Sequence, residues 1–241
     1  LLNSVQAFYY KVQKDNYSNA DTGLNISGGS FNRFGVSLAG KTKNFYHNID
    51  YINFSGYYAN GVGVSAWMGH GVLGTVLSQK KQIKLFFEGH YDTGDDANTT
   101  DVNEGYNPLY YNHHKYAGLM DLLAWGGLSY MSIGLEMNSS LTDKFKLQAI
   151  SFKRSSQSTG PSSISFMGFD NKFVSEDANT NASGVASKDL GLEFDFVYLK
   201  NYDSGVYLEF ILGAFIPDDY MKAYDQEKTI YSLRISTGFE F

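Results

Sequence analysis

The side chains with the most reactive chemistry are few and scattered along the chain. There are five histidines, of which His113 and His114 are adjacent. Adjacent side chains are poorly placed to hold one metal ion, so a loop or interfacial pair is the simpler interpretation. No serine lies in a recognisable nucleophile setting, and the lack of cysteine excludes disulfides and thiolate chemistry. We therefore expect neither an enzyme nor a bound cofactor.

An acidic stretch over residues 92–104 offers oxygen ligands of the kind that Ca²⁺ prefers. The candidate ligands are Asp92, Asp95, Asp96 and Asp101, with Glu104 beside them. The stretch lacks the Asp-x-Asp-x-Asp-Gly spacing of an EF-hand loop. A solvated loop is therefore the preferred interpretation, and a calcium site is the weaker one.

Charged residues recur at alternate positions of several otherwise apolar segments. If the apolar alternates face lipid, the charged ones face a water-filled lumen. The residues predicted to line that lumen are Arg33, Lys84, Glu88, Lys146, Glu193, Asp195, Glu209 and Arg234. With Lys144, Asp50 and Glu136 added, five positive charges stand against six negative ones. A conduit for a polyanion should be strongly basic, so this balance favours general solute diffusion. Pairing of these charges across strands, which would hold the wall together, is the alternative role.

The elements that must position these side chains are predicted to be strands. Over residues 231–241 apolar side chains alternate with polar ones without a fault, which is typical of a strand with one apolar and one polar face. Similar patterns predict ten strands. They cover about residues 2–13, 31–40, 45–57, 62–72, 82–91, 128–137, 144–154, 189–200, 205–216 and 229–241.

The length of these strands favours a membrane location. Most have about ten residues or more, whereas soluble domains commonly use strands of about five or six. A tilted strand that crosses a bilayer needs about nine to eleven residues. A soluble β-sandwich or jelly roll with its polar residues outward is the alternative.

Composition agrees with a membrane barrel. Aromatic residues make up 16% of the chain and charged residues only 18%, while the mean hydropathy is −0.29. We expect much of the tyrosine and phenylalanine to lie outside the wall, at the lipid and its interfaces. The purest apolar runs reach about seven residues, too short for a membrane-spanning helix. A net charge of −6 and the lack of basic patches argue against a nucleic-acid partner.

The connections between the predicted strands alternate in length. Those at 40–44, 138–143 and 201–204 are short, whereas 14–30, 92–127, 155–188 and 217–228 are long. This asymmetry is typical of outer-membrane barrels, and an even strand number places both termini at the short-turn end. Residues 59–61 form a tight hairpin signal where a long loop is expected. Residues 117–127 are predicted to form a short helix in their long loop or to fold into the lumen.

We therefore predict an all-β fold: one transmembrane antiparallel up-and-down β-barrel domain over residues 1–241, with about 10–12 strands. Inside lipid the sheet must close on itself, so the last strand must pair with the first.

Several short motifs resemble the alginate-export family of outer-membrane porins. They are GHYDTGD at 89–95, YNPLYY at 106–111, His114, GLMDL at 118–122, GLEFD at 191–195 and FIP at 215–217, and the similarity covers roughly residues 20–241. The terminal Phe241 is similar to the signal that the outer-membrane assembly machinery recognises. The resemblance implies a porin in the outer membrane of a Gram-negative bacterium. Members of that family have barrels of about eighteen strands, so the chain is either the C-terminal portion of a larger barrel or a shortened member. An opening that leads straight from Leu1 into a strand favours the first interpretation.

The expected function is a porin-like channel for passive diffusion or export of small polar or saccharide solutes. The expected partners are the lipid bilayer, the assembly machinery, these solutes, and further copies of the chain or other outer-membrane proteins. A structural or adhesive barrel with partner-binding extracellular loops is the alternative, favoured by the apolar residues on both faces of segment 206–215. A soluble carbohydrate-binding sandwich is the third hypothesis.

Overall fold

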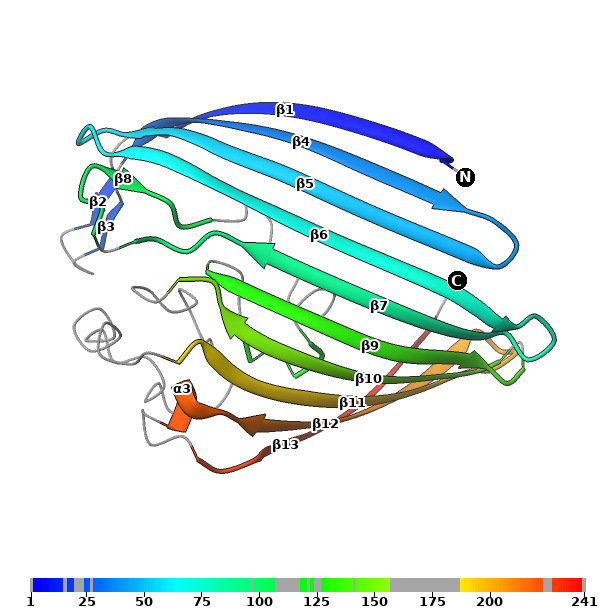
Figure 1. Cartoon of the computed structure of the whole chain (residues 1–241). Helices are drawn as coiled ribbons and strands as arrows, with labels where there is room; N and C mark the ends of the chain where they lie inside the picture. The colour runs from blue at the N-terminus through cyan, green and yellow to red at the C-terminus, as the bar shows by residue number, and fades with distance from the viewer. Residues whose placement is uncertain are drawn as a thin grey trace.

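The computed structural model describes residues 2–14, 17–19, 24–26, 28–96, 98–106, 118–120, 122–123, 127–140, 142–156, 187–222 and 227–239. Nearly all of the regular structure in these ranges is β-strand (Figure 1). An eleven-stranded sheet contains ten long strands that follow one another along an antiparallel path. They are β1 (Ser4–Lys14), β4 (Gly29–Lys41), β5 (Phe45–Tyr58), β6 (Gly63–Ser78), β7 (Ile83–Asp92), β9 (Leu128–Asn138), β10 (Asp143–Arg154), β11 (Asp189–Asn201), β12 (Val206–Pro217) and β13 (Ile230–Phe239).

These ten strands match the ten predicted from alternation, in number and in order. The largest difference is in β6, which continues six residues beyond its predicted end, to Ser78. Small elements in the predicted loops were missed. They are β2 (Tyr17–Asn19), β3 (Leu24–Ile26), β8 (Val102–Asn103) and the helical turn α3 (Asp219–Lys222). β2 and β3 form a separate hairpin, and β8 pairs in parallel with the start of β6.

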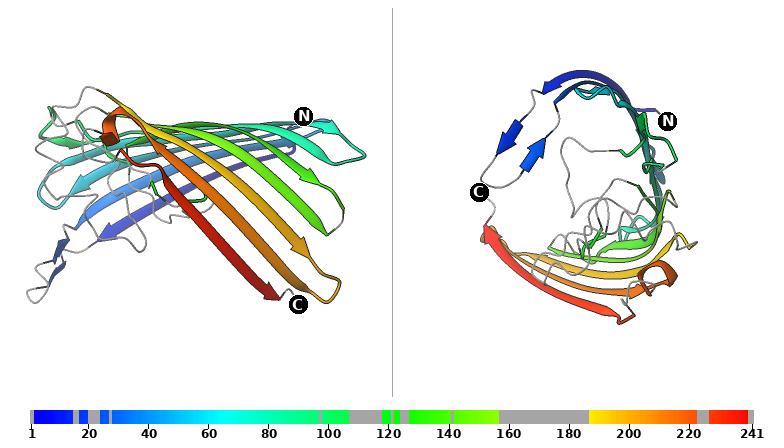
Figure 2. Two further views of the ribbon diagram at one scale, coloured as in Figure 1. Left: turned by 90° about the horizontal axis from the view of Figure 1, so that it is seen from below. Right: turned by 90° about the vertical axis from the view of Figure 1, so that its left-hand side faces the viewer.

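The sheet curls around an interior but is not closed (Figure 2). Within the described residues β1 pairs only with β4, and β13 pairs only with β12. The prediction of an antiparallel all-β fold is confirmed, whereas a closed barrel remains a prediction. Four short connections, at 42–44, 79–82, 139–142 and 202–205, lie at the end of the sheet toward which both termini point, and we name it the turn end (Figure 1). The opposite end, with the long connections and the tight turn at 59–62, is the loop end.

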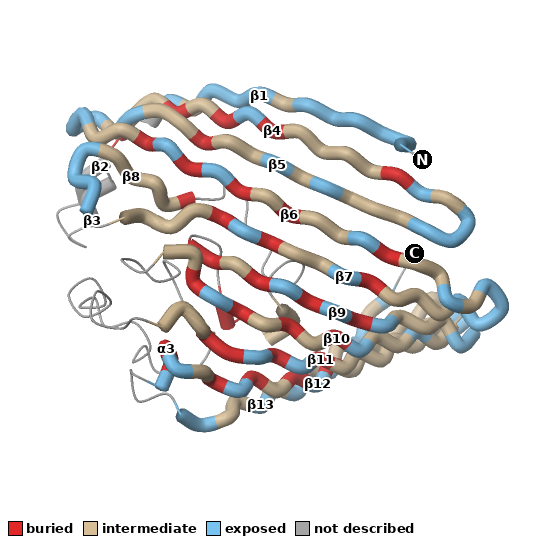
Figure 3. The backbone as a smooth tube through the Cα atoms, viewed as in Figure 1, coloured by how far each residue is buried: buried red, intermediate tan, exposed pale blue. Residues whose placement is uncertain are grey.

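The two faces of the sheet differ in chemistry and in exposure. Along β9, for example, Met131 is 76% exposed whereas its neighbours Tyr130 and Ser132 are buried (Figure 3). The side chains exposed on the outer face are mostly aliphatic or aromatic. They include Val5, Tyr9, Phe34, Ile49, Tyr51, Trp67, Leu73, Phe87, Tyr91, Met131, Ile133, Leu135, Leu147, Leu192, Phe194, Leu212, Ile216, Tyr231, Leu233, Ile235 and Phe239. The enclosed inner face carries the buried charged and polar groups, so the wall presents its apolar side outward.

Aromatic rings on the inner face lie over glycines of the neighbouring strand. Phe8 covers Gly35, Tyr46 covers Gly74, Phe86 covers Gly134 and Tyr207 covers Gly238, and each of these is a direct cross-strand pair. In every case a Cβ on the glycine would collide with the ring or with the backbone that carries it. Much of the tyrosine and phenylalanine was expected outside the wall, and these rings show that a further part of it lies on the inner face.

Candidate functional site

The candidate functional site is the inner face of the sheet. Strand register places side chains on the same face when their residues pair directly, because partners across strands point to the same side. Lys84 pairs with Glu136, Glu136 with Lys146, and the row continues through Val197 and Ile211 to Arg234. All eight residues predicted to line a lumen lie on this inner face: Arg33, Lys84, Glu88, Lys146, Glu193, Asp195, Glu209 and Arg234. Their lining of a water-filled pore stays a prediction.

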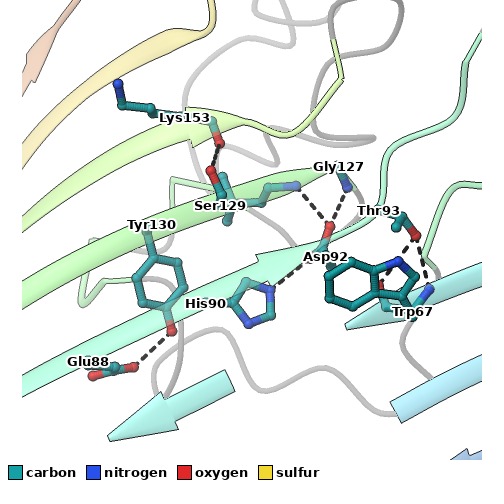
Figure 4. A network of polar contacts seen from close by, with 10 residues as sticks. Trp67, Glu88, His90, Asp92, Thr93, Gly127, Ser129, Tyr130 and Lys153 are labelled. Carbon is teal, nitrogen blue, oxygen red and sulfur yellow. Dashed lines mark hydrogen bonds and ion pairs between the residues drawn. The ribbon is translucent and has the colours of Figure 1, made fainter. Parts of the chain in front are cut away.

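A polar network crosses the inner face from β5 to β9. His70 lies between two carboxylates, with Nε2 3.0 Å from Glu88 Oε1 and Nδ1 3.6 Å from Asp50 Oδ2. The Tyr130 hydroxyl donates a hydrogen bond of 2.8 Å to the same Glu88 oxygen (Figure 4). Glu88 is thus held by partners from two neighbouring strands, as expected for a charge that supports the wall.

Next to this network, His90 pairs with Asp92 at the loop end of β7. Nε2 of His90 lies 2.9 Å from Asp92 Oδ2, and both side chains are buried (Figure 4). The His90 ring stacks on Tyr130 with 5.2 Å between the ring centroids. The other oxygen of Asp92 accepts hydrogen bonds from the backbone N–H groups of Gly127 and Leu128. Asp92 therefore ties β7 to the segment that leads into β9.

A cavity of about 460 Å³ opens inside the turn end. Four lysines and two glutamates are among the residues around it: Lys41, Lys43, Lys84, Lys146, Glu88 and Glu136. The Lys84 ammonium lies 3.6 Å from the Glu136 carboxylate, and the Lys146 ammonium lies 5.1 Å from the Phe86 ring centroid. Both lysines keep part of their surface open to solvent. The cavity is therefore polar and more cationic than the inner face as a whole.

A packed apolar cluster lies in the interior at the loop end. Its members come from the inner face of the strands and from the loops: Phe31, Phe54, Val64, Ala66, Met68, Tyr106, Leu122, Leu123, Leu128, Tyr130, Ile150, Phe152, Leu190, Phe215, Tyr220 and Met221. Two buried arginines stack on its rings, Arg33 on Phe54 at 4.2 Å and Arg154 on Tyr220 at 4.3 Å. In the loop that follows β8, burial raises the pKa of Tyr106 to about 12. Its hydroxyl therefore stays protonated at neutral pH.

The acidic candidates for a calcium site are divided between two places. Asp92 lies on the inner wall, engaged by His90, while Asp95 and Asp96 lie in the following loop. Asp95 accepts the backbone N–H of Glu104 at 3.0 Å. Across the described ranges, no three His, Asp or Glu side chains gather as a metal ion would require. The calcium interpretation therefore gains no support.

Some candidate residues lie outside the described residues, namely His113, His114 and the predicted assembly signal Phe241. Of segment 117–127, the described residues lie against the inner wall, since Leu119 and Met120 contact Glu193 and Leu123 is buried in the apolar cluster. This agrees with the second of the two arrangements expected for the segment, in which it folds inward, and not with a short helix that stays in the loop.

Sequence reasoning missed the central position of His70. It is a single polar residue in a stretch of small and apolar side chains, so its own strand gives little signal. Its alternation with Gly69 and Gly71 does place it on the face of Met68 and Val72. Only the pairing register of the strands shows that His70 lies between Asp50 and Glu88. Sequence spacing and residue type do not indicate that these three side chains meet.

Comparison of the chain with protein-family models and with curated proteins gave no match. The resemblance to the alginate-export family therefore stays a prediction. Among the described residues, no helix is both long enough and apolar enough to cross a membrane.

Proposed function

We propose that this protein is an outer-membrane β-barrel that lets small polar solutes diffuse passively through its interior. The observation that carries the proposal is the inversion of the wall, with apolar side chains exposed outside and charged ones enclosed. A soluble protein rarely exposes a contiguous apolar surface of this extent. In a bilayer the acyl chains would cover that surface. Strands of membrane barrels alternate in the same way, with apolar residues toward lipid and polar residues toward the lumen.

The free edges of the sheet fit the same proposal if they are paired in the membrane. No water is available in the bilayer core to bond the exposed N–H and C=O groups of an edge strand. We propose that β1 and β13 close the wall, either by pairing with each other or by pairing with further strands. Strand lengths of ten to sixteen residues support this arrangement, since they suffice to cross a bilayer at a tilt.

The interior supports a conduit for small polar solutes. The turn-end cavity of about 460 Å³ has the size of a small-ligand site, and its lining mixes lysine, glutamate, glutamine and threonine. Hydroxyl-rich or weakly charged solutes, including saccharides, can exchange hydrogen bonds with such groups. The resemblance to the alginate-export family supports the same outer-membrane location. It does not identify the solute.

Planar-bilayer recording of the purified, folded protein tests the channel proposal. We expect discrete conductance steps whose size is reduced by neutral saccharides that enter the lumen. Liposomes that contain the protein should also swell in isosmotic solutions of small sugars and not of large dextrans. A correctly folded sample that shows neither conductance nor swelling would refute the channel.

A second function, a structural or adhesive barrel with a closed interior, is favoured by one observation. The apolar cluster at the loop end is closely packed, with Leu123 and Phe215 each only 1% exposed. A sealed barrel predicts no sugar flux while its long loops capture a partner. The swelling assay therefore distinguishes the two functions directly.

A further inference from the structure

The connection from β8 to β9 enters the interior of the curled sheet. Of this connection the structure describes residues 118–120, 122–123 and 127, and short green pieces of it lie within the curve (Figure 2). Leu122 and Leu123 are only 6% and 1% exposed and belong to the apolar cluster at the loop end. These residues therefore lie inside the curled sheet, at its loop end.

Carboxylates of the wall hold this segment through its backbone. On β11, Glu193 Oε1 accepts the N–H groups of Leu119 at 2.8 Å and Met120 at 3.1 Å. Asp195 Oδ2 adds a longer contact of 3.4 Å to the Leu119 N–H. Buried backbone N–H groups need an acceptor, because leaving them unpaired costs free energy. Glu193 is 0% exposed, so this anchor is shielded from solvent.

A second anchor holds the other end of the segment. Asp92 on β7 accepts the N–H groups of Gly127 and Leu128, as described above. β9 and β10 separate β7 from β11 in the sheet. The two anchors thus fix the described ends of the segment to strands on either side of that pair.

Two glycines allow the close approach at the first anchor. Gly118 has φ +83°, and a Cβ there would collide with the Glu193 carboxylate. On β12, a Cβ on Gly213 would lie 2.5 Å from Met120 Cγ. The wall and the segment therefore each have a glycine where they approach closely. A loop that lay loosely in the lumen would not need these glycines.

We propose that Glu193, Asp195 and Asp92 are positioning residues that hold the described residues of segment 118–127 inside the curled sheet, where these residues narrow the interior. This inference rests on the proposed channel. It gives Glu193 and Asp195 a role other than contact with the solute, because both are buried where they hold the segment. Lys146 and Arg234 lie on the same inner face and interact electrostatically with Asp195.

A single-cysteine experiment tests the anchors without relying on conductance. The chain has no cysteine, so Leu123→Cys introduces the only thiol. In the otherwise unchanged protein we expect slow reaction with a membrane-impermeant maleimide. Adding Glu193→Ala and Asp195→Ala should raise the labelling rate about tenfold or more, because opening of the segment becomes easier. The control is Glu136→Ala with Glu209→Ala, which removes two inner-face carboxylates for which the structure shows no hydrogen bond to the segment, and it should leave the rate unchanged.

A second variant guards against loss of folding. Gly118→Ala places a methyl group against Glu193 and leaves the wall intact, and it should raise the labelling rate in the same direction. Circular dichroism identifies the folded samples. Equal labelling rates in the folded anchor variants, the control and the parent would overturn the inference.

Conductance then separates the inference from the channel proposal. If the anchors set the constriction, the anchor variants should show larger conductance steps than the parent. Raised labelling with conductance that is present but unchanged would overturn the constriction. Raised labelling with no conductance in any variant would overturn the channel and leave the role of the anchors in holding the segment supported.

Discussion

Replacement of Gly134 by alanine tests whether aromatic rings over glycines hold the inner wall together. Gly134 lies on β9 opposite Phe86 on β7. An alanine Cβ would lie 2.5 Å from Phe86 Cε1, with Cζ closer still, and 2.7 Å from the carbonyl oxygen of Leu147. The methyl group therefore meets both a ring and the backbone of the other neighbouring strand.

The size of the effect follows from these distances. Carbon atoms pack at about 3.5–4.0 Å, so the Phe86 ring would have to retreat by about 1 Å or more. The Leu147 carbonyl belongs to the sheet and cannot move without disturbing the ladder. Overpacking of this kind costs about 1–3 kcal/mol. We expect Gly134→Ala to lower the free energy of unfolding by that amount.

Gly89 on β7 provides the matched control. A Cβ there meets nothing within 4 Å, so Gly89→Ala should be neutral or stabilising by up to about 1 kcal/mol. Equilibrium urea unfolding, followed by tryptophan fluorescence, measures both variants. Phe86→Leu combined with Gly134→Ala should recover part of the loss, since the smaller side chain makes room. Equal stabilities for the two alanine variants would refute the reasoning.

Three further predictions concern the lumen, the outer face and the loops. Lys84→Gln with Lys146→Gln removes two charges from the turn-end cavity, so the reversal potential in a salt gradient should shift towards cation preference. Ile133→Lys on the outer face should cost about 2–4 kcal/mol if that position faces lipid, whereas in water a surface change of this kind stays within about 0.5 kcal/mol. Burial and the neighbouring Glu104 carboxylate raise the pKa of Asp95 above its ordinary value. Its loop should therefore lose stability as pH rises from the unfolded-state pKa through that raised pKa, and Asp95→Asn should abolish this dependence in hydrogen exchange of residues 93–106.

The positions of the long strands could be predicted because alternation of apolar and polar residues reports them directly. β13 is the clearest case, since every second residue from Tyr231 to Phe239 faces outward. The short strands β2, β3 and β8 have two or three residues each, too few for a period to appear. Closure of the sheet is a different kind of question, because it depends on which edges meet and not on the pattern within any strand.

For the candidate site, the sequence likewise predicts the face of the sheet on which each side chain lies. Parity along a strand assigns a side chain to a face, and it placed all eight charged candidates on the inner face. It does not show what lies over that face. Glu193 and Asp195 have the same parity as residues that line an open lumen, yet they are engaged by the backbone of a segment about seventy residues away along the chain. Contacts of that range leave no trace in local spacing.

The glycine and aromatic residues show what the pairing register of the strands reveals beyond the alternation within each strand. Twenty-five glycines and thirty-seven phenylalanines and tyrosines are compatible with lipid-facing aromatics alone. Register instead joins several of them in pairs, such as Phe86 over Gly134, on the face away from the apolar surface. A slip of one residue between β7 and β9 would break that pair and separate Lys84 from Glu136, and it would turn the charged face of one strand outward. Ring packing, ion pairing and the apolar outer surface therefore all select the same register, which makes the inner face a defined surface able to hold a segment inside the curled sheet.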